Sequence, residues 1–96
     1  MKFKVPDSFE IYGSTIKVKR VPDGGMQSNY EYAHWDAFEQ LIEIRYGLTA
    51  DADRHSFLHE WFHAAFQASG YPKLSTDEVL VDTMAGLLAQ MLKTAR

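Results

Sequence analysis

The chain has 96 residues, which is enough for one domain, and we treat residues 1–96 as that single domain. Hydrophobic residues make up 46% of the chain and aromatic residues 14%, a composition that supports one compact core and argues against disorder. Because there is no cysteine, disulfides, thiolate metal ligands and cysteine nucleophiles are excluded. Any bound metal must be held by nitrogen and oxygen atoms, and the nitrogen must come from four histidines.

Charge and hydropathy exclude further classes of protein. The formal net charge of −3 argues against a broad contact with nucleic acid or acidic lipid. No apolar run approaches the roughly 18 residues of a membrane span, and the first six residues lack the apolar core of a signal peptide. We therefore expect a soluble cytoplasmic protein that contacts neither nucleic acid nor a membrane.

The first half of the chain shows the alternation of apolar and polar residues that is typical of strands. Segments 9–12 and 15–21 flank Gly13-Ser14, which predicts a hairpin with a two-residue turn. In the second segment one face is expected to carry Ile16, Val18 and Val21, and the other Lys17, Lys19 and Arg20. Residues 22–25 have the composition of a loop. Segments 30–35 and 40–46 predict two more strands around a turn at 36–39, although 35–44 can also be interpreted as a helix.

The second half of the chain is helical in pattern. Residues 52–69 contain no Pro or Gly, and Gly70 follows where a left-handed residue typically ends a helix. After a short connection with Pro72, a second helix is expected from about Ser75 to Lys93. Its predicted buried stripe has spacings i, i+4, i+7, i+8 and i+11 and consists of Leu80, Met84, Leu87, Leu88 and Met91. A second strip, of small residues that allow another element to approach closely, consists of Ala85, Gly86 and Ala89.

These elements predict an α+β fold. Two helices joined by about five residues pack antiparallel. The expected architecture is a small, mainly antiparallel sheet of three or four strands packed on a two-helix hairpin.

Three polar residues interrupt the apolar surface of the first helix, at His59, Glu60 and His63. Residues i and i+4 lie one turn apart on the same side of a helix, so both imidazoles can point at one place. This is the H-E-x-x-H arrangement, in which two histidines hold Zn²⁺ and the glutamate takes a proton from metal-bound water. The competing interpretation is a pair of hydrogen-bonded core histidines beside a solvent-facing Glu60. Because buried imidazole and carboxylate are costly without partners, we favour the metal site.

A zinc site needs a third protein ligand, and the second helix offers two acids. Glu78 and Asp82 lie four residues apart on one face, so one can bind the metal and the other can orient a histidine through its second ring nitrogen. We favour Glu78 as the ligand, with Asp82 behind a histidine, but the reverse assignment stays open. A third interpretation is that Ser75-Thr76-Asp77-Glu78 is a capping box, in which Glu78 only caps its own helix.

These two motifs, His59-Glu60-Trp61-Phe62-His63 and Glu78-x-x-x-Asp82, resemble those of glutamate-zincin metallopeptidases. The whole chain is similar to the minimal metallopeptidase-like proteins common in bacteriophage genomes. The resemblance covers about residues 56–92 and implies His59, His63 and Glu78 as zinc ligands and Glu60 as general base. It also implies that Asp82 contacts a ligand histidine. The chain lacks the second subdomain of larger relatives and the H-E-x-x-H-x-x-G-x-x-H continuation.

Three further residues are candidates for contacts with substrate or with a developing oxyanion: His34, His55 and Tyr71. His34 lies on an expected strand, where it can also be an ordinary surface histidine. His55 precedes His59 by one turn, too far along a straight helix to share an ion with both His59 and His63, and is expected at the rim. The pattern gives no preference for Tyr71 over other tyrosines as a donor.

The sequence thus predicts a zinc-dependent hydrolase, most simply a peptidase, acting on a peptide or protein substrate. The alternative is a non-catalytic binding or regulatory module that uses the same zinc site for stability, since a domain this small has a limited core. Water access to the metal separates these two functions. The pattern gives no indication of an oligomeric state.

Overall fold

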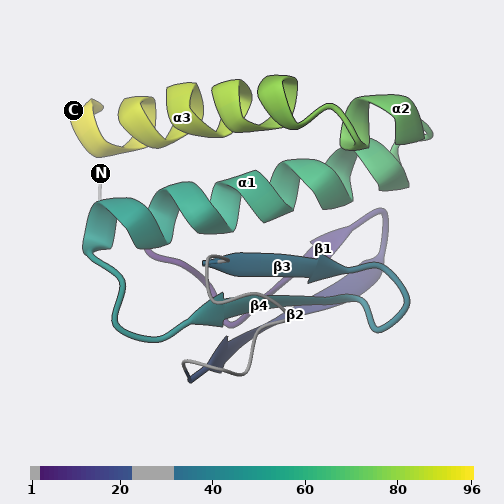
Figure 1. Cartoon of the computed structure of the whole chain (residues 1–96), viewed down its shortest axis with the longest axis horizontal. Helices are drawn as coiled ribbons and strands as arrows, with labels where there is room; N and C mark the ends of the chain where they lie inside the picture. The colour runs from purple at the N-terminus through teal and green to yellow at the C-terminus, as the bar shows by residue number, and fades with distance from the viewer. Residues whose placement is uncertain (1–2, 23–31) are drawn as a thin grey trace.

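Four strands form one sheet, and a long helix packs across one face of it (Figure 1). The computed structural model describes residues 3–22 and 32–96. Along the chain, the elements are β1 (Ser8–Ile11), β2 (Ser14–Val21), β3 (Ala33–Asp36), β4 (Leu41–Arg45), α1 (Ala50–Ala68), α2 (Pro72–Ser75) and α3 (Glu78–Thr94). Helix α1 lies between the sheet and α3, and α1 and α3 run antiparallel, which confirms the α+β prediction.

The sheet is mixed, with the strand order β1-β2-β4-β3. The pairs β1–β2 and β3–β4 are antiparallel hairpins as expected, and β2 and β4 join them in parallel, with Val18 opposite Ile42. The expectation of a mainly antiparallel sheet therefore missed one pairing. Alternation and turn residues specify each hairpin locally, but they do not specify how two hairpins join. The join leaves β3 at one edge of the sheet.

The first hairpin turns one residue earlier than expected. Ile11 pairs with Ser14, so the turn residues are Tyr12 and Gly13, with φ values of 48° and 82°. Two successive positive φ values are the requirement of a type I′ hairpin turn, and glycine meets it without strain.

The strand predictions need one correction, which concerns the two faces of β2. Ile16 and Val18 of β2 face the core as expected, but alternation then places Arg20, not Val21, on the same face. The Arg20 guanidinium forms a bidentate ion pair with Asp53 of α1, which explains a cation on the helix side of the sheet. Residues 35–44 form strands and a turn rather than a helix, and residues 30–31 of the expected third strand lie outside the described residues.

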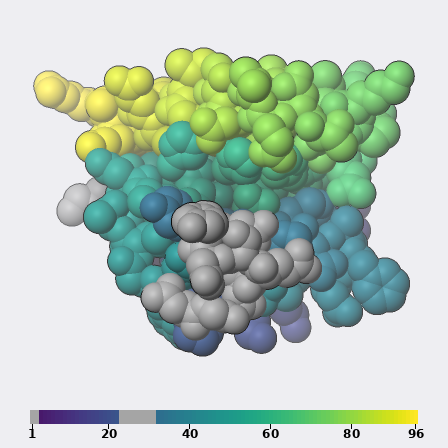
Figure 2. Space-filling model, viewed as in Figure 1, coloured from purple at the N-terminus to yellow at the C-terminus, as the bar shows by residue number. Residues whose placement is uncertain are grey.

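The core lies between the sheet and α1 and continues between α1 and α3. One cluster of its buried residues consists of Ile16, Ile42, Ile44, Phe57, Leu58, Ala85 and Ala89. The two alanines confirm the prediction that the small-residue strip of the second helix allows close approach. In the space-filling view, α3 covers α1 as an outer layer (Figure 2).

The predicted buried stripe of α3 was wrong in part, because only Leu80 and Leu88 of its five members are partly buried. The buried positions are Val81, Ala85 and Ala89, whereas Met84, Leu87 and Met91 are exposed. Both sets follow helical periodicity, so the pattern alone does not choose between them. The helix packs through its narrower strip because small side chains bring the two helix axes close together.

The connection between the long helices contains a third, one-turn helix. Helix α1 ends as predicted, with Gly70 at a φ of 84°; the N–H groups of Gly70 and Tyr71 donate to the carbonyls of Gln67 and Phe66, a Schellman motif. Pro72 then begins α2, a position where its missing N–H costs nothing. None of the described helices is long and apolar enough to cross a membrane.

Candidate metal centre

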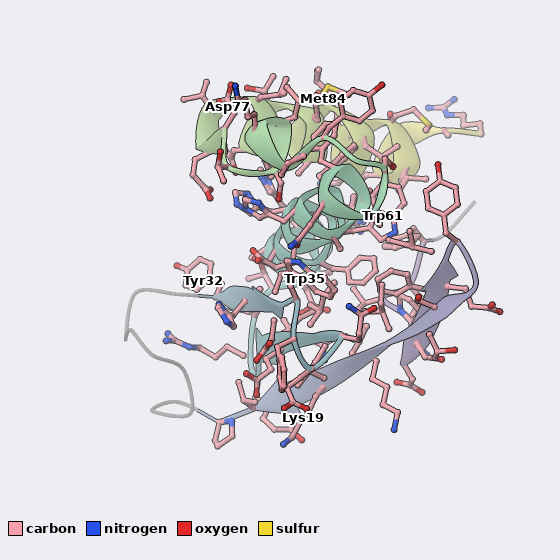
Figure 3. All side chains as sticks on the ribbon, turned by 90° about the vertical axis from the view of Figure 1, so that its right-hand side faces the viewer. Lys19, Tyr32, Trp35, Trp61, Asp77 and Met84 are labelled. Carbon is pink, nitrogen blue, oxygen red and sulfur yellow. The ribbon has the colours of Figure 1, made fainter. Side chains whose placement is uncertain are left out.

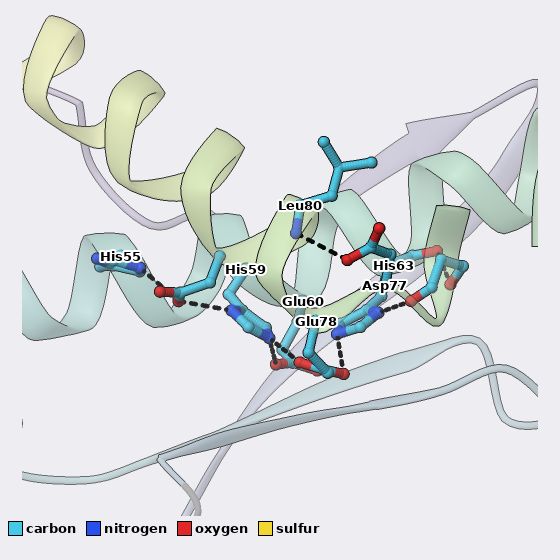
Figure 4. Close-up of polar contacts among 9 residues, drawn as sticks. His55, His59, Glu60, His63, Asp77, Glu78 and Leu80 are labelled. Atoms are coloured by element: carbon cyan, nitrogen blue, oxygen red, sulfur yellow. Dashed lines mark hydrogen bonds and ion pairs between the residues drawn. The ribbon is translucent and has the colours of Figure 1, made fainter. Parts of the chain in front are cut away.

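His59 and His63 lie one turn apart on α1 and point toward the beginning of α3 (Figure 4). Their ring centroids are 4.9 Å apart. His59 Nε2 lies 3.0 Å from Glu78 Oε2, and His63 Nε2 lies 3.1 Å from Glu78 Oε1. One carboxylate on α3 therefore faces the same ring nitrogen of both histidines.

The opposite ring nitrogens also face oxygen atoms. His59 Nδ1 lies 3.0 Å from Asp82 Oδ1, and His63 Nδ1 contacts the main-chain carbonyl of Ser75. The Ser75 carbonyl can only accept, and so can the Asp82 carboxylate, so both Nδ1 atoms carry a proton. Each Nε2 then presents a lone pair to Glu78, unless the imidazole ring carries a second proton at that nitrogen. The contacts of His59 and His63 with Glu78 are therefore satisfied in one of two ways. Either each Nε2 carries a proton that it donates to the Glu78 carboxylate, or one cation lies between the three side chains.

Glu60 is buried beside these histidines. Its side chain is 12% exposed, compared with 67% for Glu78, and its Oε2 lies 4.0 Å from His59 Nε2. Burial raises the pKa of the Glu60 carboxyl above its usual value, while the imidazoles of His59, His63 and His34 act in the opposite direction. Glu60 is thus a desolvated carboxyl group with an increased proton affinity.

The three interpretations of Glu78 and Asp82 make different geometric demands. Glu78, not Asp82, faces the Nε2 atoms, and Asp82 lies behind His59. The capping box does not form, because the N-cap of α3 is Asp77, whose carboxylate accepts from the Leu80 N–H at 3.0 Å. The hydroxyl of Ser75 instead donates to the main-chain carbonyl of His63. Glu78 is therefore free of a capping role.

Two groups of side chains bring possible metal-ligating atoms within 4.8 Å of one another. One group is His59, Glu60 and His63, and the other is His55, His59 and Asp82. Neither group includes Glu78, but its oxygens contact the Nε2 atoms of His59 and His63, so a cation at these nitrogens would have the carboxylates of Glu60 and Glu78 nearby. Two imidazoles and a carboxylate are a common donor set for Zn²⁺, and this fit comes entirely from side chains on α1 and α3.

The candidate metal centre opens into two adjoining hollows between the edge strand β3 and the helices. One has a volume of about 470 Å³ and is lined by His34, Glu60 and Glu78 among others. The other, of about 540 Å³, is lined by His55, Asp82 and Tyr32 among others, and His59 and Glu60 line both. Tyr32 and Asp77 project on the same side of the molecule (Figure 3).

The remaining predicted residues have different positions. His34 lines the hollow next to Glu60. His55 lies at the rim, where its Nε2 is 2.9 Å from Asp82 Oδ1, so it contacts the carboxylate that faces His59. Tyr71 is exposed just after α1 and is not among the described residues that line either hollow.

Sequence reasoning missed one contact, the carbonyl of Ser75 on His63 Nδ1. A main-chain acceptor has no signature in side-chain pattern, so only the fold reveals it. Comparison with protein-family models, with curated proteins and with solved structures gives no match for this chain.

Proposed function

We propose that this protein binds Zn²⁺ through His59, His63 and Glu78 and acts as a small peptidase of the glutamate-zincin type. The observation that carries the proposal is the convergence of two Nε2 atoms on the two oxygens of Glu78, at 3.0 and 3.1 Å. The Nδ1 contacts with Asp82 and Ser75 support it, because histidine ligands in proteins usually donate their other N–H to an oxygen.

The proposed donor set suits catalysis as well as binding. Catalytic zinc sites use three protein ligands and keep a position for water or substrate. Zinc in such a site lowers the pKa of water toward about 7 and polarises a carbonyl group. The two hollows next to His59 and Glu60 provide room for a substrate at this position.

Glu60 is the proposed general base. Its carboxylate would accept a proton from the attacking water and pass it to the leaving amine. Its burial favours this role, because a raised pKa increases the basicity of a carboxylate. His34 lines the same hollow and is a candidate donor to the substrate carbonyl.

The outer edge of β3, an edge strand of the sheet in the described part of the chain, is the proposed place for an extended peptide. The carbonyl of Tyr32 accepts from the N–H of Arg45, so alternation turns the main-chain groups of Ala33 and Trp35 away from β4. Both residues also line the smaller hollow. A peptide strand that pairs with them would pass the candidate metal centre.

The second candidate function is a binding module in which zinc is structural. It is favoured by the way the site joins two elements, since His59 and His63 come from α1 and Glu78 from α3. A cation there would tie the outer helix to the rest of a small domain. Catalysis then distinguishes the two candidates.

Metal analysis combined with turnover of a broad peptide library tests this proposal. Wild type is expected to hold about one zinc per chain and to cleave peptides, whereas Glu60→Gln keeps zinc and loses cleavage. Glu39→Gln, in the exposed turn before β4, serves as the matched control and should behave as wild type. Absence of zinc after purification without chelator would overturn the proposal.

Two other outcomes would revise it. Zinc binding without any cleavage would support the structural module. Equal cleavage by wild type and Glu60→Gln would remove Glu60 as the base.

A further inference from the structure

Ser75 and His63 make two reciprocal hydrogen bonds between α1 and α2. The Ser75 hydroxyl donates to the main-chain carbonyl of His63 at 2.9 Å, and the His63 Nδ1–H donates to the main-chain carbonyl of Ser75. Both groups are partly buried. In each of the two hydrogen bonds, the side chain of one residue donates to the main chain of the other.

We propose that Ser75 is a positioning residue for the candidate metal centre. Its hydroxyl holds the α2 turn on α1, so that its own carbonyl fixes the His63 ring with Nε2 toward Glu78. The proposal rests on the zinc site proposed above and adds a residue that neither motif contains.

The burial pattern shows why this hydroxyl matters. Every residue from 71 to 79 is exposed except Ser75, which is half-buried. Helix α2 has only four residues and no side-chain cap at its N-terminus. Ser75 is thus the least exposed residue of this segment, and its hydroxyl is bonded to the main chain of the site helix.

The same contact also affects the third proposed ligand. Glu78 follows Ser75 by three residues, directly after the N-cap Asp77. The place where α2 is held on α1 therefore sets the start of α3 and the distance of Glu78 from the histidines. A shift of Ser75 would move the His63 ring and Glu78 together.

Zinc affinity tests the proposal, measured by competition with a chromophoric chelator. Ser75→Ala is expected to weaken zinc binding about 10-fold, within the 10–100-fold range typical of groups that orient a ligand. Ser75→Thr keeps the hydroxyl and should restore most of the affinity. The matched control is Thr76→Ala, which removes the neighbouring hydroxyl bonded to the Lys73 carbonyl at 2.9 Å and should leave the affinity unchanged.

A second readout uses the wild-type protein and does not depend on any variant folding. In the zinc-loaded wild-type protein, NMR of the imidazole nitrogens should show a His63 Nδ1–H that is protected from exchange. An unprotected His63 Nδ1–H in wild type would overturn the proposal.

The measured zinc affinities can also contradict the proposal. Wild-type affinity in Ser75→Ala, or an equal loss in Thr76→Ala, would also overturn the role of Ser75. Failure of wild type to bind zinc at all would instead refute the proposed metal centre, and the role of Ser75 with it.

Discussion

At the scale of single residues, the fold separates three carboxylates that look alike in the sequence into three different environments at the candidate metal centre. Glu60 is buried, Glu78 faces the Nε2 atoms, and Asp82 faces an Nδ1 atom of the same histidine pair. The hydrogen bonds from His55 and then His59 lower the pKa of Asp82, so it stays ionised and an acceptor near neutral pH. The three acids are thus suited to the three proposed roles of general base for Glu60, metal ligand for Glu78 and partner that orients His59 for Asp82.

This separation predicts unequal effects of removing Glu78 and Asp82. Asp82→Ala should weaken zinc binding by about 10–100-fold, since it removes a partner that orients His59. Glu78→Ala should weaken binding more, because it removes a ligand. The affinities can be measured by chelator competition. If Asp82→Ala caused the larger loss, Asp82 would be the ligand, which is the alternative that the sequence left open.

At the scale of elements, the packing of α3 depends on which of its two apolar faces is buried. Val81 is fully buried, whereas Leu87 is 61% exposed. Val81→Ala should therefore lower the free energy of unfolding by about 2 kcal/mol, and Leu87→Ala by no more than about 0.5 kcal/mol. Urea unfolding of the two variants measures both values. A larger loss for Leu87→Ala would show that the outer face is covered.

Gly86 offers a test of how closely α1 and α3 approach. A Cβ added there would lie 3.5 Å from His55 Cε1, which is an ordinary van der Waals contact. Glycine in a helix interior costs up to about 1 kcal/mol relative to alanine. Gly86→Ala is therefore expected to raise the midpoint of thermal unfolding. A lowered midpoint would mean that α1 and α3 pack too closely to accept a Cβ at this position.

The pair Asp51–Lys93 links α1 to α3 and predicts a pH dependence. The hydrogen bond from Lys93, then that from Arg54, lowers the pKa of Asp51 from its usual 3.8. A lowered pKa stabilises the folded state above pH 3.8, and this contribution is lost as the pH falls through the folded-state value. The difference in urea midpoint between wild type and Asp51→Asn should shrink between pH 6 and pH 3. A constant difference would contradict this.

Helical periodicity explains why so much of the candidate site could be predicted. The i, i+4 spacing of His59 and His63, and of Glu78 and Asp82, places each pair on one helix face whatever the rest of the fold does. The Ser75 carbonyl, the parallel β2–β4 pairing and the exposed face of α3 could not be predicted in this way. They depend on long-range packing, which local pattern does not encode.

At the scale of the whole molecule, the candidate metal centre joins α1 to α3 on the side where β3 is the edge strand of the described sheet. Zinc that binds only the folded state stabilises it by about 2.7 kcal/mol at a free concentration 100 times the Kd. For a domain of this size the thermal midpoint should then rise by roughly 10–20 °C. Glu78→Ala should remove most of the rise, and a wild-type midpoint insensitive to zinc would contradict binding to the folded state.

The central claim is the coordination of zinc by His59, His63 and Glu78, and X-ray absorption at the zinc edge of the loaded protein tests it most directly. We expect two imidazole nitrogens and one carboxylate oxygen from the protein, at about 2.0–2.2 Å, with water completing the shell. The Glu78→Ala variant should lose the carboxylate or fail to retain zinc. A wild-type spectrum without imidazole, or a protein that retains no zinc, would contradict the claim.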